Sequence, residues 1–322
     1  MNRFISLLVF IVIVVVLWTG AWFFAAKMLK DEVQKQFLAS AQTPQSYSCE
    51  KLSVAGFPFR FDVTCTNFSL NQLDLTLTLP ELKATVLVYR PTHFLVFAQG
   101  PLAIKDSFSG SSREVQWESL RASLRTNGWA LARLSLEGKN ISLFDNLIGQ
   151  TLVASTSLVE AHLLEDTQDQ STSKDLQQFQ FLIKTENATA PEFDINNANL
   201  TFEAQVADMP DDLRQWSPSV ISSNWSKNQT GVTVQKFTGR DEISEFSING
   251  QFTTTAQSML SGNFDFFSTN LSTRFARFLD ENSTQVIFGN QSEDGSFYQS
   301  YALVHGVLLA GNLPIFTFSP IR

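Results

Sequence analysis

The sequence has few of the residues that usually carry metal or covalent chemistry. Its 322 residues include 2 Cys and 3 His, too few for a zinc cluster or an iron–sulfur site. The nucleophile elbow, the P-loop and the dinucleotide-binding glycine motif are also missing from it. We therefore predict a protein that is not an enzyme, with no catalytic residues, no metal and no cofactor.

Charge is also scarce. Charged residues make up 17% of the chain and the net charge is −8, whereas soluble proteins carry roughly 25% charged residues. Nucleic-acid binding needs a basic surface, so we expect no nucleic-acid partner. Asp241 and Glu242 are adjacent acids. Because neighbouring residues do not face each other, the two carboxylates are poor candidates for a paired acid and base, and we expect them to be solvated charges.

Aromatic and aliphatic residues are plentiful by comparison. Hydrophobic residues reach 43%, with 29 Phe beside 6 Trp and 4 Tyr. This composition excludes a disordered chain and allows a sizeable core.

The longest apolar run begins near the N-terminus. No charge interrupts the segment from Phe4 to Ala26, which as a helix spans ~35 Å and exceeds the ~30 Å hydrocarbon core of a bilayer. Bulky Trp22, Phe23 and Phe24 stand where cleavage of a signal peptide would be expected. The segment therefore favours an uncleaved signal anchor over a cleaved signal peptide.

This run sets the expected domain organisation. Residues 1–27 are predicted to be a transmembrane signal anchor, residues 28–46 a helical stalk and residues 47–322 a β-rich domain. A polar stretch at 166–175 is a candidate boundary inside that domain, or else only a loop tip.

The two cysteines bear on the compartment. Cys49 and Cys65 flank Gly56, Phe57 and Pro58, a turn signal. A symmetric hairpin that turns at Phe57 would place the two sulfurs opposite each other, although a one-residue bulge would bring the apolar residues of the two strands together better. A disulfide needs an oxidising compartment, which favours the periplasm. The alternative is two unrelated buried thiols.

Beyond residue 47 apolar and polar residues alternate. Leu73, Leu75, Leu77 and Leu79 form one such run, and many runs of this kind indicate antiparallel sheet. Helical spacing interrupts them twice, at 213–220 and 271–279. The predicted fold class is mainly β: a transmembrane helix, then a large curved antiparallel sheet or β-groove with a few short helices.

Phenylalanine at strand spacing is the main candidate for a binding feature. Such residues form either a closed β core or an apolar groove that shields acyl chains. The candidates are Phe179, Phe181, Phe202, Phe246, Phe252, Phe264 and Phe266.

Three segments carry a resemblance to a known family. GFPFRFD at 56–62, YRPTH at 89–93 and HGVLLAGNLPIF at 305–316 resemble the DUF2125 proteins of alphaproteobacteria. The resemblance implies an N-terminal membrane helix and a cysteine-flanked hairpin, and it implies no biochemical role. The plan of an anchor followed by repeating strands is similar to AsmA-like envelope proteins, which carry lipids along β-grooves.

These observations lead to one functional prediction and one alternative. We predict a single-pass inner-membrane protein whose bulk lies in the periplasm and which binds or passes lipid in cell-envelope maintenance. The alternative is a structural or scaffolding envelope protein that binds another envelope protein.

Overall fold

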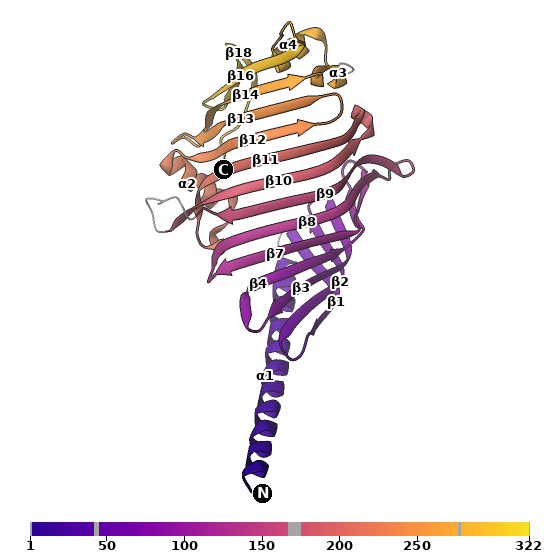
Figure 1. The fold of residues 1–322 in the computed structure, drawn as a ribbon, viewed down its shortest axis with the longest axis vertical. Coiled ribbons are helices and arrows are strands. Elements are labelled where there is room, and N and C mark those ends of the chain that lie inside the picture. The colour runs from indigo at the N-terminus through magenta and orange to yellow at the C-terminus, as the bar shows by residue number, and fades with distance from the viewer. Residues whose placement is uncertain (1, 42–44, 167–174, 276–277, 322) are drawn as a thin grey trace. The chain divides into compact units, whose positions relative to one another are not determined.

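The computed structural model describes residues 2–41, 45–166, 175–275 and 278–321 (Figure 1). Within these residues the fold is mainly β, as predicted, and the strand pairings are antiparallel. The helices are α1 (Asn2–Ser40), α2 (Pro218–Asn228), α3 (Leu271–Phe275) and α4 (Glu281–Phe288), and the 3₁₀ turns are η1 (Pro191–Phe193) and η2 (Leu213–Gln215).

The strands follow one another closely along the chain. They are β1 (Gln45–Ala55), β2 (Arg60–Gln72), β3 (Leu75–Leu87), β4 (Arg90–Gln99), β5 (Leu102–Asp106), β6 (Ser112–Gln116), β7 (Ser119–Asn127), β8 (Ala130–Asp145), β9 (Thr151–Glu165), β10 (Leu176–Ala190), β11 (Ile195–Pro210), β12 (Gly231–Arg240), β13 (Glu245–Thr254), β14 (Leu260–Thr269), β15 (Asn290–Gln291), β16 (Ser296–Val304), β17 (Val307–Ala310) and β18 (Leu313–Thr317).

The chain divides into two compact units. The first unit holds residues 1–121 and 144–151, and the second holds 122–143 and 152–322. The chain therefore passes between the units within β7, β8 and β9. The boundary predicted at 166–175 falls largely outside the described residues and stays a prediction.

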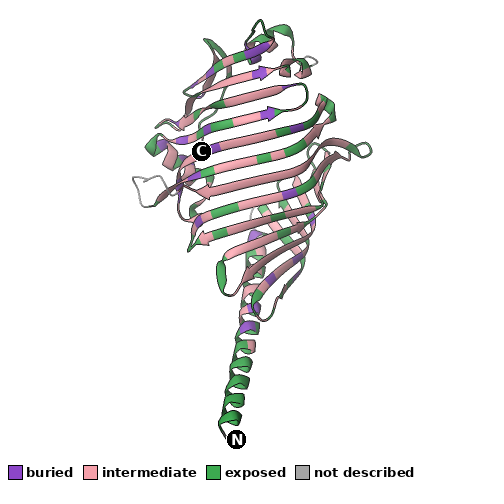
Figure 2. Ribbon diagram, viewed as in Figure 1, coloured by how far each residue is buried: buried purple, intermediate pink, exposed green. Residues whose placement is uncertain are grey.

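In the first unit a hairpin ladder packs against the end of α1. Strand β2 lies between β1 and β3, and β3 pairs with β4 through one half and with β5 through the other. Helix α1 is exposed along its N-terminal part, and where it meets the strands Trp22, Ala26 and Ser40 are buried while neighbouring residues stay exposed (Figure 2). It is the one helix of the described chain that is long and apolar enough to cross a membrane, with a mean hydropathy of 2.8 in its most apolar stretch.

In the second unit the strands pair in chain order. Strand β10 pairs with β9 and β11, and the ladder continues through β12, β13 and β14 to β16 (Figure 1). The β10–β11, β12–β13 and β13–β14 connections are short, whereas longer connections carry η2 and α2 between β11 and β12, and α3 and α4 between β14 and β16. Because neighbouring strands pair directly, alternate side chains of these strands share one face.

The helical spacing predicted at 213–220 corresponds to η2 and to the start of α2, which continues to Asn228. Pro218 is its first residue, where the missing N–H costs nothing, and the Ser217 hydroxyl accepts a hydrogen bond from the Val220 amide at 3.3 Å. The Trp216 and Trp225 indoles donate to the carbonyls of Pro210 and Ala207, at 2.8 and 2.6 Å. These contacts fix the helix over the end of β11.

Candidate apolar binding site

The predicted phenylalanines of the second unit lie on one face of its sheet. The cross-strand partners run from Ile183 through Phe202, Phe237 and Ile248 to Phe266. The neighbouring rows place Phe179, Phe181, Phe246, Phe252 and Phe264 on the same side. The opposite face is mostly polar, with Lys184, Thr201 and Thr238 in one row.

Ring contacts connect neighbouring strands across this face. Phe181 contacts Phe202, Phe202 contacts Phe237 and Phe237 contacts Phe246, with ring centroids 5.8, 5.5 and 5.1 Å apart. All four rings are partly exposed. Farther along the sheet, Phe264 stacks on Tyr301 at 4.7 Å.

Phe179 plays a different part. It is fully buried and packs with Leu131 and Met209, and the Trp216 ring meets it edge-on at 5.5 Å. Helix α2 and the preceding turn therefore close one end of the phenylalanine face into a conventional core. At the other end Phe288 of α4 covers Phe266 at 5.7 Å between ring centroids. The phenylalanine face is therefore covered in these two places and partly exposed at Phe181, Phe202 and Phe246.

At the ends of the strands near η1 and the β12–β13 turn, away from the end that α2 covers, lies an apolar cavity of about 340 Å³. Its walls come from β8 to β13, and most of its lining side chains are aliphatic or small. Among them are Ile141, Leu143, Ala154, Ala188, Ala198, Leu200 and Phe246. Of the seven predicted phenylalanines, Phe246 is the one in this lining. The volume falls within the range of about 300–1,000 Å³ that is typical of small-molecule sites.

Gly239 shapes the floor of the cavity. It lies opposite Phe246 in the β12–β13 ladder, and a Cβ atom at this position would come within 2.3 Å of the Phe246 ring. The absence of a side chain at Gly239 therefore leaves room for the Phe246 ring, and any larger residue there would displace this ring.

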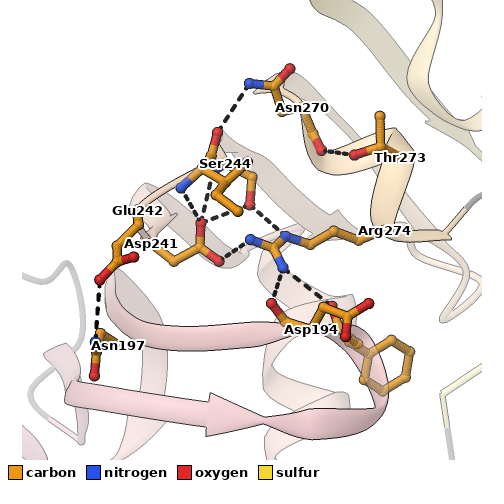
Figure 3. A network of polar contacts seen from close by, with 10 residues as sticks. Asp194, Asn197, Asp241, Glu242, Ser244, Asn270, Thr273 and Arg274 are labelled. Carbon is orange, nitrogen blue, oxygen red and sulfur yellow. Dashed lines mark hydrogen bonds and ion pairs between the residues drawn. The ribbon is translucent and has the colours of Figure 1, made fainter.

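A buried ion pair lies beside the cavity (Figure 3). The carboxylate of Asp241, which lines the cavity, accepts from the Arg274 guanidinium, and both side chains are less than a tenth exposed. Arg274 Nε also donates to the Ser244 hydroxyl at 2.9 Å, and its Nη1 donates to the carbonyls of Phe193 and Asp194. One side chain thus joins α3, the β12–β13 turn and η1.

The second oxygen of Asp241 is satisfied by the turn itself. It accepts from the Ser244 and Ile243 amides at 2.7 and 3.0 Å and from the Ser244 hydroxyl at 3.0 Å. Burial works against ionisation, but these hydrogen bonds and the charge of Arg274 outweigh it and lower the pKa of Asp241. The pair is internally satisfied, so it holds the wall of the cavity rather than offering a charge to a ligand.

The expectation of two solvated charges at 241 and 242 is half wrong. Glu242 is exposed, but the side chain of Asp241 is buried because the turn folds its carboxylate inward towards Arg274. Nothing in the local pattern distinguishes the two residues. The partner, Arg274, lies on another element 33 positions away.

A second apolar cavity, of about 500 Å³, lies where α3 and α4 approach η1. Phe193, Phe275, Phe278 and Phe288 contribute to its walls. Since Arg274 binds the Phe193 carbonyl and Asp241 together, the buried ion pair connects the walls of both cavities.

The predicted hairpin in the first unit is confirmed with a different register. Cys49 and Cys65 form a disulfide with their Cα atoms 5.7 Å apart. However, Leu52 lies opposite Cys65, and Phe68 lies opposite Cys49. The loop occupies Gly56–Phe59, whereas the symmetric prediction centred it on Phe57. This shift pairs Val54 with Val63 and so brings apolar residues together.

Among the residues that the structure describes, no group of three or more metal-ligating side chains lies together. The His162 ring nitrogen Nδ1 lies 3.0 Å from the Ser135 hydroxyl, and His305 occupies the tight turn between β16 and β17 with a φ of 47°. Both positions suit structural roles.

The family match covers residues 22–288 and is described as an uncharacterized protein conserved in bacteria. The chain belongs to the DUF2125 family. The match begins at Trp22 inside α1, includes the disulfide hairpin and both cavities, and ends with α4. Comparison with curated proteins and with solved structures found no match. Membership of DUF2125 brings no assigned biochemical role, so the function is argued from geometry.

Proposed function

We propose that this DUF2125 protein is an uncleaved single-pass protein of the inner membrane, with its β-rich bulk in the periplasm, and that the second unit binds an acyl chain of a lipid. The observation that carries the proposal is the apolar cavity on the phenylalanine face, whose lining offers a chain-like ligand few polar contacts. Removing a hydrocarbon chain from water contributes ~0.8 kcal/mol for each buried CH₂ group.

The lining argues for an acyl chain rather than for a charged group. Arg240 is among the lining residues, but two positions earlier Thr238 lies on the polar face, and Arg240 pairs opposite Glu245 on that same face, with 3.9 Å between its Nε and the Glu245 carboxylate. The ligand class that fits the cavity is therefore a lipid with one acyl chain inserted.

Three features support the anchor and its orientation. The apolar part of α1 is exposed over most of its length, as a lipid-facing helix requires. Trp22 is 6% exposed because the first unit packs on it, so cleavage after this point would remove part of that unit. The Cys49–Cys65 disulfide suits an oxidising compartment. Alkaline phosphatase fused after Arg322 tests the orientation. We expect the fused phosphatase to be active, and a fusion that stays inactive in the cytoplasm would contradict the orientation.

Native mass spectrometry of the detergent-extracted full chain tests lipid binding. The wild type is expected to retain phospholipid, and Leu200→Trp, which fills the cavity, is expected to lose it. Thr201→Trp is the matched control, since the neighbouring residue of the same strand points to the opposite face. Equal lipid retention by all three proteins, or by none of them, would contradict the proposal.

A further inference from the structure

The loop that connects β1 and β2 is bound to the apolar part of α1. The Trp18 indole donates to the Pro58 carbonyl, and the Trp22 indole donates to the Arg60 carbonyl, each at 3.2 Å. The Phe57 ring stacks on Phe23 at 5.9 Å between centroids. The loop is therefore fixed at the height of residues 18–23 of the helix.

That height lies within the span predicted to cross the bilayer. If Phe4 marks the cytoplasmic edge of an upright helix, a ~30 Å hydrocarbon core ends near Phe24. Trp18 then lies ~9 Å inside this edge, and Trp22 lies ~3 Å inside it. The Pro58 carbonyl, bound to Trp18, lies at a similar depth.

The loop presents apolar side chains to its surroundings at this depth. Phe57 is 47% exposed and Phe59 is 60% exposed, while Tyr89 in the adjacent β3–β4 turn is 68% exposed. The two turns are joined, since the Val88 amide donates to the Phe59 carbonyl at 2.9 Å. Exposed Arg90 follows Tyr89, and a long Arg side chain at the end of a membrane segment can extend to the interface.

We infer that this tip, Gly56–Phe59 with Val88–Arg90, is inserted into the outer leaflet of the membrane that holds α1. The occupant of its exposed apolar surface is lipid, because the helix to which the tip is bound is itself surrounded by lipid at that level. Aromatic side chains favour this interfacial zone, and an insertion of ~5–10 Å is usual for interfacial elements. The tip and the helix together hold the first unit at two points on the bilayer.

This inference rests on the anchoring in the proposed function and does not depend on a lipid in the cavity of the second unit. Nitroxide labels on introduced cysteines test it in the full-length chain, reconstituted in vesicles of phosphatidylethanolamine and phosphatidylglycerol. The quantity measured is the accessibility of each label to oxygen and to a nickel chelate, because oxygen partitions into the hydrocarbon whereas the nickel chelate stays in water. The native cysteines are bonded to each other and remain unlabelled.

Labels at Phe59→Cys and Tyr89→Cys are expected to give an oxygen-to-nickel accessibility ratio severalfold above that of Phe108→Cys. Phe108 is a matched control, because it is 88% exposed in the same unit. It follows β5, whose Asp106 pairs with Leu75 at the far end of β3, ~40 Å along the strand from the tip.

A label at Ile11→Cys distinguishes a failure of the membrane anchor from a failure of the inserted tip. Ile11 is 52% exposed in the middle of the apolar part of α1, so an aqueous signal there would show that the anchor itself is wrong. A hydrocarbon signal at Ile11 together with an aqueous signal at Phe59 and Tyr89 would overturn the inserted tip alone. Labels at the tip that are shielded from both reagents would reveal a protein cover and would also overturn it.

Discussion

The indole ring of Trp22 stacks on the ring of Phe61, with 5.3 Å between the ring centroids and 11° between their planes. Phe57 meets the same indole edge-on at 5.6 Å, and Trp22 is 6% exposed. The end of the apolar helix is thus part of the core of the first unit, so anchor and domain are stabilised together.

Replacing this ring should destabilise the first unit. Trp22→Ala removes the stacking partner of Phe61 and the hydrogen bond to Arg60, and truncation of a buried aromatic costs about 3–5 kcal/mol. Amide hydrogen exchange in β2 is expected to become faster. Phe24→Ala is the control, because Phe24 is 70% exposed on the same helix and its loss should leave exchange in β2 unchanged. Equal effects of the two variants would contradict the packing.

The disulfide should contribute stability through its loop. Cys49 and Cys65 are 16 positions apart, and closure of a loop of this length is worth about 3 kcal/mol in the chain-entropy model. The double variant Cys49→Ser with Cys65→Ser is expected to lose about that free energy of unfolding in chemical denaturation.

The same bond reports on the compartment in cells. After the free thiols are blocked, reductant is expected to unmask two cysteines that accept a gel-shifting label. Thiols that are already reactive before the reductant is added would contradict an oxidising environment.

The buried ion pair should be sensitive to the loss of one partner. Arg274→Met leaves the Asp241 carboxylate buried without its counter-charge, which costs about 3–5 kcal/mol. Lys139→Met provides the control, since the Lys139–Glu137 pair is partly exposed, with 3.6 Å between Nζ and Oε1, and such pairs contribute at most about 1 kcal/mol.

Combining Arg274→Met with Asp241→Leu should recover much of the loss, because the unpaired charge is then gone. Denaturation midpoints of the three variants measure these differences. A midpoint for Arg274→Met that matches Lys139→Met would show that the pair is not buried as described.

Acid should weaken the second unit through the same carboxylate. The pKa of Asp241 is lowered in the folded chain, so its contribution to stability is fully present above the unfolded value of ~3.9 and is lost as the pH falls through the folded value. Asp241→Asn should therefore flatten the decline in stability below about pH 4. Denaturation midpoints across this range test the prediction, and parallel curves for the wild type and the variant would contradict it.

The sequence predicted the parts of this protein that depend on local pattern. The apolar run, the turn at Gly56 and the alternation that places Phe202 and Phe264 on one face all follow from residue spacing. Phe237 was not among the predicted phenylalanines, because the ladder shifts register between Val234 and Phe237. The shift breaks the two-residue period just where the ring joins the face.

Long-range features could not be predicted in this way. The cavity depends on the way β8 to β13 surround a space. The Asp241–Arg274 pair joins two elements that are far apart in the sequence, and no local pattern predicts that they come into contact. Likewise, the sequence shows Trp22 only as a bulky residue near the end of the apolar run, while its role as a core residue of the first unit depends on the position of Phe61.

The central claim is that the cavity of the second unit holds lipid. A photoreactive amino acid in place of Ala188, which lines the cavity, tests this in intact cells, with Lys184 on the opposite face of the same strand as the control position. The account predicts that illumination attaches phospholipid at position 188 and not at 184. A protein adduct at 188, or equal lipid labelling at both positions, would contradict it.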